Sequence, residues 1–501
     1  MIDLAIKING ATLRGIHGHC VSVEIHIARG LPTFNIVGMG DTAVKESKDR
    51  VRAAILNAGF QFPLGKITAN LAPADIKKEG TLLDLPIAIG ILLASKQINI
   101  KNIDEYLLLG ELSLLSELRS IKGSLPIIME GIENNFKKFI LPNDNKKEAS
   151  IIDSANIYPC KNLHDVIEVL TKRIEPYKKK FMNNYKEEYT IDFSEIIGQH
   201  SAKRGVIVAA AGNHNLILFG PPGIGKSMIA DRIPTILPKI SYEESLECTR
   251  IYSVVGEFKE GLIYKRPFRN PHHTATKIAM VGGGANLMPG EISLAHNGVL
   301  FLDEMLEFKR EVLECLRQPL ENRSIQISKS TGKVEYPSNF MLIGALNTCP
   351  CSKLPCTCSE YEKNRYLKKL SGPLLDRIDL FLSVDYIDYD NMKNNSKQIS
   401  SAEMREKINI AREIQSERLK KYKIQTNGEM DMSMVKKYCI LDNAGEKIIE
   451  KIYKNYSMSL RAYSKILKLS RTIADLEERD RISEGDIIEA FQYRRFINEV
   501  I

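Results

Sequence analysis

The sequence predicts an α/β core preceded by an α+β domain and followed by a helical tail. Three observations support this fold class. An apolar stretch at 215–219 runs into a glycine-rich turn and then into a helix that starts at Lys226. Two later apolar stretches, 298–302 and 340–345, have the composition of buried strands in a parallel sheet covered on both faces. The length of 501 residues allows three domains at roughly 100 to 200 residues each.

Composition and charge limit the class of protein. Hydrophobic residues form 44% of the chain and charged residues 26%, the balance of a protein with buried cores. The net charge of +8 permits nucleic-acid binding but does not by itself indicate it. The N-terminus lacks a basic segment followed by a long apolar run, so it does not resemble a secretory signal. The longest apolar stretch, 85–94, contains Pro86 and Gly90 and is shorter than the roughly 20 residues of a membrane helix. We therefore expect a cytoplasmic protein without membrane contact.

Two changes in composition divide the chain. The first, at 172–188, is rich in lysine, and the second, at 388–398, is rich in Asp, Asn and Lys. The first indicates either a linker or the solvated basic end of a helix, and both interpretations keep the boundary. The predicted regions are an N-terminal domain at 1–170, a basic linker at 171–191, a core at 192–387 and a C-terminal helical region at 388–501.

Local signals predict elements in the two outer regions. Alternating residues at 20–28 indicate a half-buried strand. Asp41 is placed to cap a helix that ends before Gly59, with apolar residues and Ser47 on one face. Ser400 and Glu403 form a capping-box pattern for a helix toward Lys421. Further helices are predicted from Ser459 and from Ser483.

The glycine-rich turn matches the phosphate-binding loop at every fixed position. Its glycines allow backbone N–H groups to approach phosphates at a helix N-terminus. The lysine is expected to reach the β and γ phosphates of ATP, and the serine to offer its hydroxyl to Mg²⁺. The eight residues are Gly220, Pro221, Pro222, Gly223, Ile224, Gly225, Lys226 and Ser227.

Polar residues at the ends of two later strands complete the predicted site. Asp303 follows the stretch at 298–302 and is expected to hold Mg²⁺ together with Ser227, while Glu304 is expected to polarise the attacking water as general base. Alone, this acidic pair would more often be an exposed helix cap. Asn347 follows the third strand and is expected to orient the water, although an Asn there is often only a turn residue.

Two arginines are candidates for contact with the transferring phosphate. Arg377 lies in the segment 370–379 and could act in the site of a neighbouring subunit as an arginine finger, if the protein forms a ring. Otherwise it pairs with Asp376 or Asp379. Arg461, early in the helix from Ser459, could reach the γ-phosphate as a second sensor or lie solvated on its helix.

Cysteine and histidine clusters raise the question of a metal. Four of the nine cysteines lie close together, and four thiolates could bind zinc with tetrahedral geometry. Only one residue separates the members of each pair, so a reduced loop packed beside Asn347 is the alternative. The adjacent His272 and His273 also suggest a metal ligand set, but a structural role in a proline-bounded loop is favoured. The clustered cysteines are Cys349, Cys351, Cys356 and Cys358.

A lysine-bearing hairpin is the predicted DNA contact. Segments 325–329 and 333–336 flank Ser-Thr-Gly, a turn signal, with Lys329 and Lys333 near the tip. A ring with such hairpins pointing inward would follow DNA phosphates without reading sequence. An exposed hairpin with ordinary surface lysines is the alternative.

Several longer segments give a family resemblance that covers nearly the whole chain. The sequence resembles the ComM or YifB family of magnesium-chelatase-like AAA+ ATPases. This resemblance implies a P-loop AAA+ core, a C-terminal helical lid and an N-terminal domain similar to the proteolytic domain of Lon. The matching segments are 30–38, 43–47, 50–54, 67–75, 266–274, 282–284 and 289–298.

The resemblance also carries expectations about activity. The N-terminal domain is expected to lack the Lon catalytic dyad, because 78–84 holds no serine and Lys122 is the nearest candidate for the lysine. The better understood members of this family act as hexameric helicases that drive branch migration of DNA during natural transformation, and the resemblance implies the same activity here. A chelatase-like or remodelling ATPase subunit that acts on a protein partner is the alternative.

Overall fold

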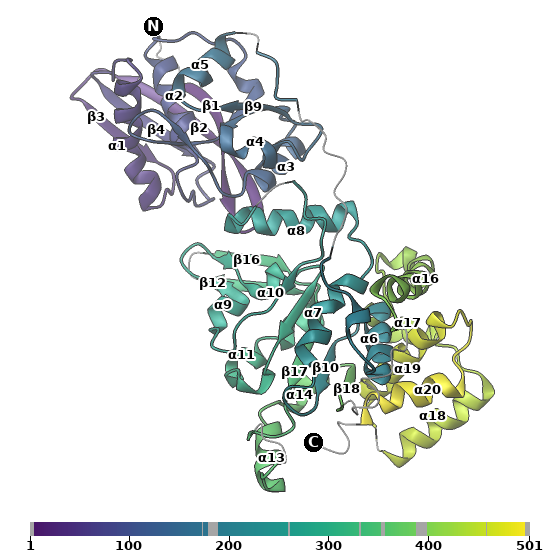
Figure 1. The fold of residues 1–501 in the computed structure, drawn as a ribbon. Coiled ribbons are helices and arrows are strands. Elements are labelled where there is room, and N and C mark those ends of the chain that lie inside the picture. Colours follow the sequence, from purple (N-terminus) through teal and green to yellow (C-terminus); the bar gives the residue numbers. More distant parts are fainter. Residues whose placement is uncertain are drawn as a thin grey trace.

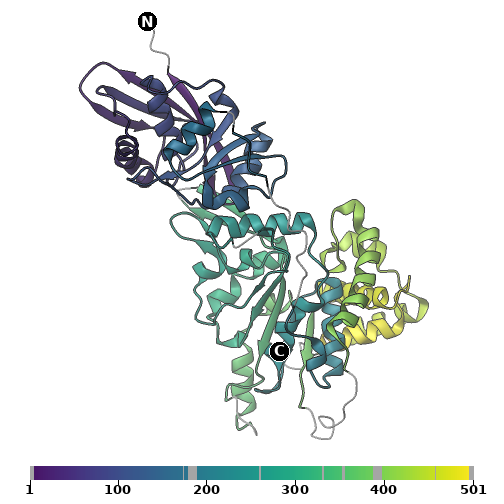
Figure 2. The same ribbon diagram turned by 45° about the horizontal axis from the view of Figure 1, so that its top comes forward.

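The chain forms two α/β sheet units and a group of C-terminal helices. The structure is a computed structural model and describes residues 5–172, 174–178, 189–258, 261–329, 332–351, 356–386, 398–456 and 458–495. Figures 1 and 2 show the N-terminal unit at one end, the second sheet in the middle and the C-terminal helices beside it. Most of the predicted linker at 171–191 and most of the stretch at 388–398 lie outside the described residues.

The N-terminal unit is built on a mixed sheet of seven strands in the order β3-β4-β2-β1-β5-β8-β9. β2 pairs antiparallel with β1 and β4, and the other pairs are parallel. The strands are β1 Ile6–Arg14, β2 His17–Ala28, β3 Thr33–Val37, β4 Lys66–Ala72, β5 Tyr106–Leu108, β8 Lys138–Pro142 and β9 Asn156–Cys160, with a small ribbon of β6 Glu111–Leu112 and β7 Leu118–Arg119. The helices are α1 Thr42–Asn57, α2 Asp84–Ala94, α3 Ser124–Glu133, α4 Lys146–Ala149 and α5 Leu163–Thr171.

Helix α1 confirms the prediction made from Asp41. The Asp41 carboxylate accepts a hydrogen bond from Val44 N at 2.9 Å and so satisfies one of the free N–H groups of the first turn. The five residues assigned to one face are all buried, and Gly59 follows with φ of 77°. They are Val44, Ser47, Val51, Ala54 and Ile55.

The second sheet is fully parallel, with the strand order β11-β14-β17-β10-β18. Alternate residues enter two hydrophobic clusters: Val299 and Phe301 belong to one, Leu300 and Leu302 to the other. This two-sided burial explains the continuous apolar runs in the sequence. The strands are β10 Leu216–Phe219, β11 Phe268–Arg269, β14 Val299–Leu302, β17 Met341–Leu346 and β18 Leu380–Ser383.

Helices and two small ribbons surround this sheet. The longer helices are α6 His200–Gly212, α7 Lys226–Ile236 and α8 Tyr242–Val255. The shorter ones are α9 Lys277–Val281, α10 Glu291–Leu294, α11 Arg310–Glu314, α12 Arg317–Asn322, α13 Glu360–Leu367 and α14 Gly372–Leu375. The ribbons pair β12 Gly282–Gly283 with β13 Met288–Pro289, and β15 Ser324–Lys329 with β16 Gly332–Pro337. The second ribbon is the predicted hairpin.

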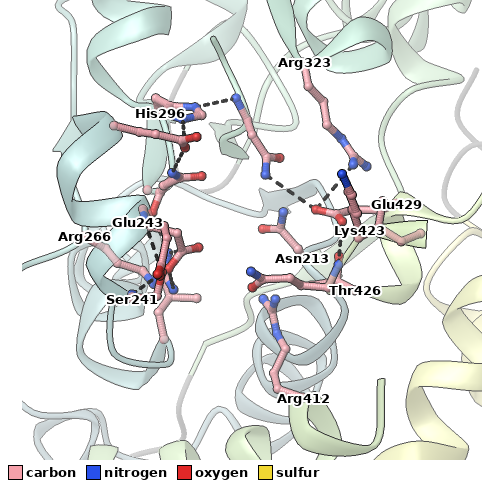
Figure 3. A pocket seen from close by; sticks show the side chains of 18 residues that line it. Asn213, Ser241, Glu243, Arg266, His296, Arg323, Arg412, Lys423, Thr426 and Glu429 are labelled. Carbon is pink, nitrogen blue, oxygen red and sulfur yellow. Dashed lines mark hydrogen bonds and ion pairs between the residues drawn. The ribbon is translucent and has the colours of Figure 1, made fainter. Parts of the chain in front are cut away.

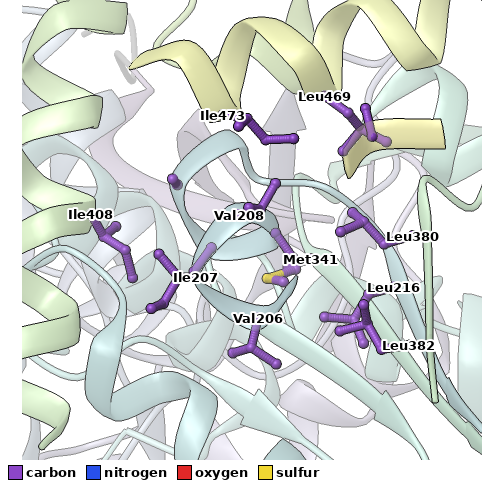
Figure 4. Packing of buried hydrophobic residues seen from close by; sticks show 14 of the residues in the cluster. Val206, Ile207, Val208, Leu216, Met341, Leu380, Leu382, Ile408, Leu469 and Ile473 are labelled. Atoms are coloured by element: carbon purple, nitrogen blue, oxygen red, sulfur yellow. The ribbon is translucent and has the colours of Figure 1, made fainter. Parts of the chain in front are cut away.

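The C-terminal helices share a hydrophobic cluster with the parallel sheet. In Figure 4, Ile408 and Ile473 lie around the α6 residues Val206, Ile207 and Val208. Helix α16 begins with both hydrogen bonds of the predicted capping box at Ser400 and Glu403, which confirms that prediction. The helices are α16 Ser401–Leu419, α17 Met432–Tyr438, α18 Asn443–Asn455, α19 Leu460–Leu476 and α20 Glu484–Gln492.

Helix α8 connects the two sheet units. Arg250 Nη2 donates to Ile16 O at 3.2 Å, at the turn between β1 and β2, and Ile16 is buried in a cluster of the second unit. At the other contact, Gly123 N donates to Ser253 O at 3.1 Å. The N-terminal unit is therefore docked through one side-chain and one backbone hydrogen bond and through apolar burial, along the helix that lies beneath it in Figure 1.

Candidate functional site

The phosphate-loop sequence connects the end of β10 to the start of α7. Gly220, Gly223 and Gly225 have φ values of 152°, 77° and 93°, which residues with a Cβ rarely adopt. A Cβ at position 220 would also lie 2.3 Å from the Val384 carbonyl oxygen. Across the residues that the structure describes, no side chain accepts a hydrogen bond from the first N–H groups of α7, which starts after Gly225. The loop thus offers a helix N-terminus suited to an anion.

Lys226 lies inside this loop. Its side chain is 8% exposed, and Nζ donates to Gly220 O at 2.9 Å, Pro221 O at 2.6 Å and Asn347 Oδ1 at 2.9 Å. Burial lowers the pKa of Lys226, and the charge of Asp303 partly opposes that effect. The structure therefore brings together the lysine of the loop and the predicted water-orienting Asn347, because β17 lies next to β10 in the sheet.

Ser227 and Asp303 also meet. Ser227 Oγ donates to Asp303 Oδ2 at 2.9 Å, and Glu304 N donates to the other oxygen of the same carboxylate at 2.9 Å. A hydroxyl beside a carboxylate is the oxygen set that Mg²⁺ takes in phosphate-handling sites. The residues present thus fit a Mg²⁺–ATP complex, with Lys226 for the phosphates and the Ser227–Asp303 pair for the metal.

Glu304 is placed by an unusual backbone conformation and by a neighbour that sequence reasoning missed. Its φ is 48°, in the left-handed region. His273 Nδ1 lies 3.7 Å from Glu304 Oε2. The His273 ring stands edge-on to Phe308 and 4.1 Å from the ring of His272, centroid to centroid. His272 bonds to Thr274 at 2.9 Å. The histidine pair thus lies in a loop beside the acidic residue, and His273 adds a contact to Glu304.

The two predicted arginines lie together, away from the phosphate loop of their own chain. Arg377 forms an ion pair with Glu321, and Arg461 Nη2 lies 3.6 Å from the same carboxylate. The Arg377 carbonyl accepts from Asn215 Nδ2 at 3.4 Å, at the amino end of β10. Gly220 is five residues further on, or roughly 16 Å at about 3.3 Å per residue. Within the described part of the chain, the ion-pair partner of Arg377 is Glu321 rather than Asp376 or Asp379, and no pattern in the sequence indicates Glu321 as a partner.

The four clustered cysteines converge beyond Asn347. Sγ of Cys351 lies 3.4 Å from that of Cys349 and 3.7 Å from that of Cys356, and all four sulfurs lie within 4.8 Å of one another. Among the described residues, none of the four forms a disulfide bond. Within the described part of the chain, this is the only group of three or more His, Cys, Asp or Glu side chains close enough together to hold a metal ion.

The hairpin of β15 and β16 presents its lysines differently. Lys333 is exposed and lies opposite Ser328, whereas Lys329 Nζ donates to Gly284 O at 2.8 Å. The other face of the hairpin is covered, since Tyr336 donates its hydroxyl to Leu287 O at 2.6 Å. Residues 330 and 331 of the predicted tip lie outside the described residues.

A polar cavity of about 520 Å³ lies between the second sheet and the C-terminal helices (Figure 3). Asn213, Gly298 and Asn339 line it and precede β10, β14 and β17, so it opens at the amino edge of the sheet, opposite the phosphate loop. Several of its lining side chains form ion pairs with one another: Arg266 with Glu244 at 2.9 Å, Arg323 with Glu429 at 3.3 Å and His296 with Glu247 at 3.0 Å. This cavity is not the nucleotide site.

The structure places the residues that were compared above with the Lon dyad. Leu82 is buried, and the neighbouring Thr81 donates its hydroxyl to Glu111 Oε2 at 2.5 Å. Lys78 is fully buried and donates to the carbonyl of Pro73. Lys122 packs beside Gly256 at the end of α8, where a Cβ would lie 2.9 Å from Lys122 Cε.

The described helices include none with the length and apolar character needed to cross a membrane.

Comparison with known proteins identifies relatives along almost the whole chain. Residues 192–392 match the family described as magnesium chelatase, subunit ChlI. Residues 23–145 match subunit ChlI of Mg-chelatase, and residues 398–494 match the C-terminal part of that subunit.

Individual relatives agree with these matches. The chain is 40% identical to competence protein ComM of Haemophilus influenzae over 506 residues, which cover 99% of this chain and 98% of that protein. It is 41% identical to the uncharacterized protein YifB of Escherichia coli over 488 residues, which cover 96% and 95% of the two chains. A weaker similarity, 24% identity over 227 residues, covers 39% of this chain and 41% of Lon protease 2 of Bacillus subtilis.

Proposed function

Because the chain belongs to the ComM and YifB family of magnesium-chelatase-like proteins, we propose that it is an AAA+ ATPase that couples ATP hydrolysis to the movement of DNA strands. The observation that carries the ATPase part is the meeting of Lys226 with Asn347 and of Ser227 with Asp303 at one edge of the parallel sheet. Four residues from three strand ends converge there, as phosphoryl transfer to water requires.

The contacts around the loop support the following proposed roles. Bound ATP supplies the scissile phosphoanhydride, and Mg²⁺ neutralises its charge. The loop amides and Lys226 would hold the phosphates, while Ser227 and Asp303 would hold the metal. Glu304 accepts the proton of the attacking water, and Asn347 orients that water. His273 acts as a positioning residue, because its ring lies against the Glu304 carboxylate and is itself fixed by Phe308.

Arg377 and Arg461 act on a neighbouring subunit. Both lie at the amino edge of the sheet, whereas the phosphate loop lies at the carboxyl edge, and both are held by Glu321. A head-to-tail contact between copies of the chain would place this edge against the next loop, and repetition of such a contact closes a ring. We expect a hexamer, as the family resemblance implies.

DNA is the proposed substrate whose strands the ATPase moves. The relative from Haemophilus influenzae is named a competence protein, which supports a role in natural transformation for this chain as well. Lys333, exposed on the hairpin, and the neighbouring Lys329 are the proposed phosphate contacts. Each phosphate contact contributes affinity that falls with salt and is insensitive to base sequence. Branch migration requires this kind of contact, because the sequence changes at every step.

The remaining regions take supporting roles. The C-terminal helices form a lid that carries Arg461, and the N-terminal domain is not proteolytic, since Leu82 and Thr81 occupy the segment where a nucleophilic serine would lie. We assign 1–170 to the N-terminal domain, 171–191 to the linker, 192–387 to the ATPase core and 388–501 to the lid. A cytoplasmic location accords with action on incoming DNA.

ATP turnover with different DNAs tests this function. Turnover is expected to rise with single-stranded or forked DNA, and the rise is expected to weaken in a Lys329→Ala/Lys333→Ala variant, with a shallower salt dependence. A double alanine variant of Lys447 and Lys451, exposed on α18, is the control. Unchanged turnover with every DNA, together with stoichiometric capture of one protein partner, would favour the alternative of a protein-remodelling subunit.

A further inference from the structure

We propose that Cys349, Cys351, Cys356 and Cys358 bind a structural Zn²⁺ ion. Four thiolates around zinc at about 2.3 Å in a tetrahedron place their sulfurs about 3.8 Å apart. The separations here are 3.4 Å and 3.7 Å for two of the pairs, with all four sulfurs within 4.8 Å. The side chains thus already have the spacing of a tetrathiolate site, although the two cysteine pairs come from two separate segments of the chain.

A backbone hydrogen bond provides a second, independent observation. Cys358 N lies 3.4 Å from Cys356 Sγ and donates to it. An N–H group directed at sulfur stabilises the negative charge of a thiolate, which is the form that binds metal. Such outer contacts orient the ligands of metal sites.

The chemistry of the four groups selects the metal. Thiolates in a tetrahedral set favour zinc or an iron–sulfur centre. An iron–sulfur cluster has several atoms in its core and holds its thiolates further apart than a single ion does. The sulfur separation of 3.4 Å is also well above the about 2.05 Å of a disulfide. Four protein ligands leave no open position, so the zinc is structural rather than catalytic.

The site would join two elements of the ATPase core. Cys349 and Cys351 follow β17 and Asn347, while Cys356 and Cys358 directly precede α13. Helix α13 is fixed to the core, because Tyr366 donates its hydroxyl to Glu307 Oε1 at 2.8 Å. A zinc ion would therefore anchor the end of β17, which carries Asn347 to its contact with Lys226. This last consequence rests on the proposed ATPase function, whereas the metal site does not.

Metal analysis of the full chain tests the site without ATP. Protein purified without chelators, or supplied with Zn²⁺ alone, is expected to hold zinc equimolar with the chain. Cys356→Ser/Cys358→Ser, which changes the pair next to α13, is expected to lower zinc content at least ten-fold. Cys20→Ser, in the N-terminal sheet, is the control and should keep it. Cobalt-loaded wild type should show the absorption bands of tetrahedral thiolate-bound Co²⁺, a measurement that does not depend on how the variant folds.

Several results would overturn the site. They are a wild-type chain whose four thiols remain reactive after Zn²⁺ is added, equal zinc in the double variant, iron in place of zinc, or a mass that shows disulfides among the four cysteines. Because zinc is measured directly, a failed zinc site would leave the ATPase proposal standing. An inactive but zinc-loaded chain would refute the ATPase proposal alone.

Discussion

The position of Arg377 predicts that two inactive variants restore activity when mixed. Arg377 lies roughly 16 Å from the phosphate loop of its own chain, counted along β10 at about 3.3 Å per residue. Its side chain cannot span that distance, so it can act only at the loop of a neighbour. Arg377→Ala is expected to lower ATP turnover by roughly 10³- to 10⁵-fold, the usual contribution of an arginine finger. Lys226→Ala is expected to be inactive through loss of phosphate binding.

The recovered activity can be calculated. In a head-to-tail ring, each site takes its loop from one chain and its arginine from the next. In an equal mixture, a site is intact when the loop comes from Arg377→Ala and the arginine from Lys226→Ala, which occurs at about one quarter of interfaces whatever the ring size. The assay is steady-state phosphate release after the variants are mixed and allowed to exchange subunits. Arg119→Ala, exposed in the N-terminal unit, is the control and should match wild type. A mixture no more active than its components, in rings shown to contain both variants, would refute action on a neighbour.

Three further changes test single residues. Glu304→Gln should keep ATP binding and lower turnover by roughly 10²- to 10⁴-fold, because it removes the general base, and wild-type turnover would contradict that role. His273→Asn should lower kcat by up to roughly 10²-fold at unchanged KM, because a misplaced reacting group costs that much. The control, His200→Asn at the exposed start of α6, should leave kcat unchanged. A change in KM alone would argue against a positioning role for His273. Burial lowers the pKa of His214 to about 4, so its contribution to stability is complete above its ordinary pKa of 6.5 and is lost as the pH falls toward 4. Wild type should therefore lose about 2 kcal/mol more unfolding free energy than His214→Gln between pH 7 and pH 5 in urea titrations, and equal losses would show that His214 is not buried in its neutral form.

Local signals were sufficient for much of the fold. The Asp41 cap and the Ser400 capping box depend on residues three positions apart. Both can therefore be predicted from the local sequence alone, without the tertiary structure. The strand before Gly220 is short, but the glycines that follow it mark its end. The hairpin of β15 and β16 was likewise evident from its turn residues.

Contacts between distant segments could not be predicted from pattern. Glu321, Arg377 and Arg461 lie in three separate segments of the chain and meet only in the folded protein. No spacing in the sequence indicates this contact. The contact of His273 with Glu304 depends on how β11 and β14 are paired in the sheet. The docking of Ile16 on the second unit was also not foreseen, because a single apolar residue in a turn carries no signal of its partner.

ATP-driven movement of a branch point tests the proposed function most directly. A labelled four-way DNA junction with homologous arms, incubated with the protein and Mg²⁺–ATP, should be converted to duplex products at a rate far above spontaneous migration. The same reaction with Glu304→Gln should show junction binding without conversion. Conversion by wild type that is independent of ATP, or brisk ATP hydrolysis on the junction with no conversion, would contradict a motor that moves DNA strands.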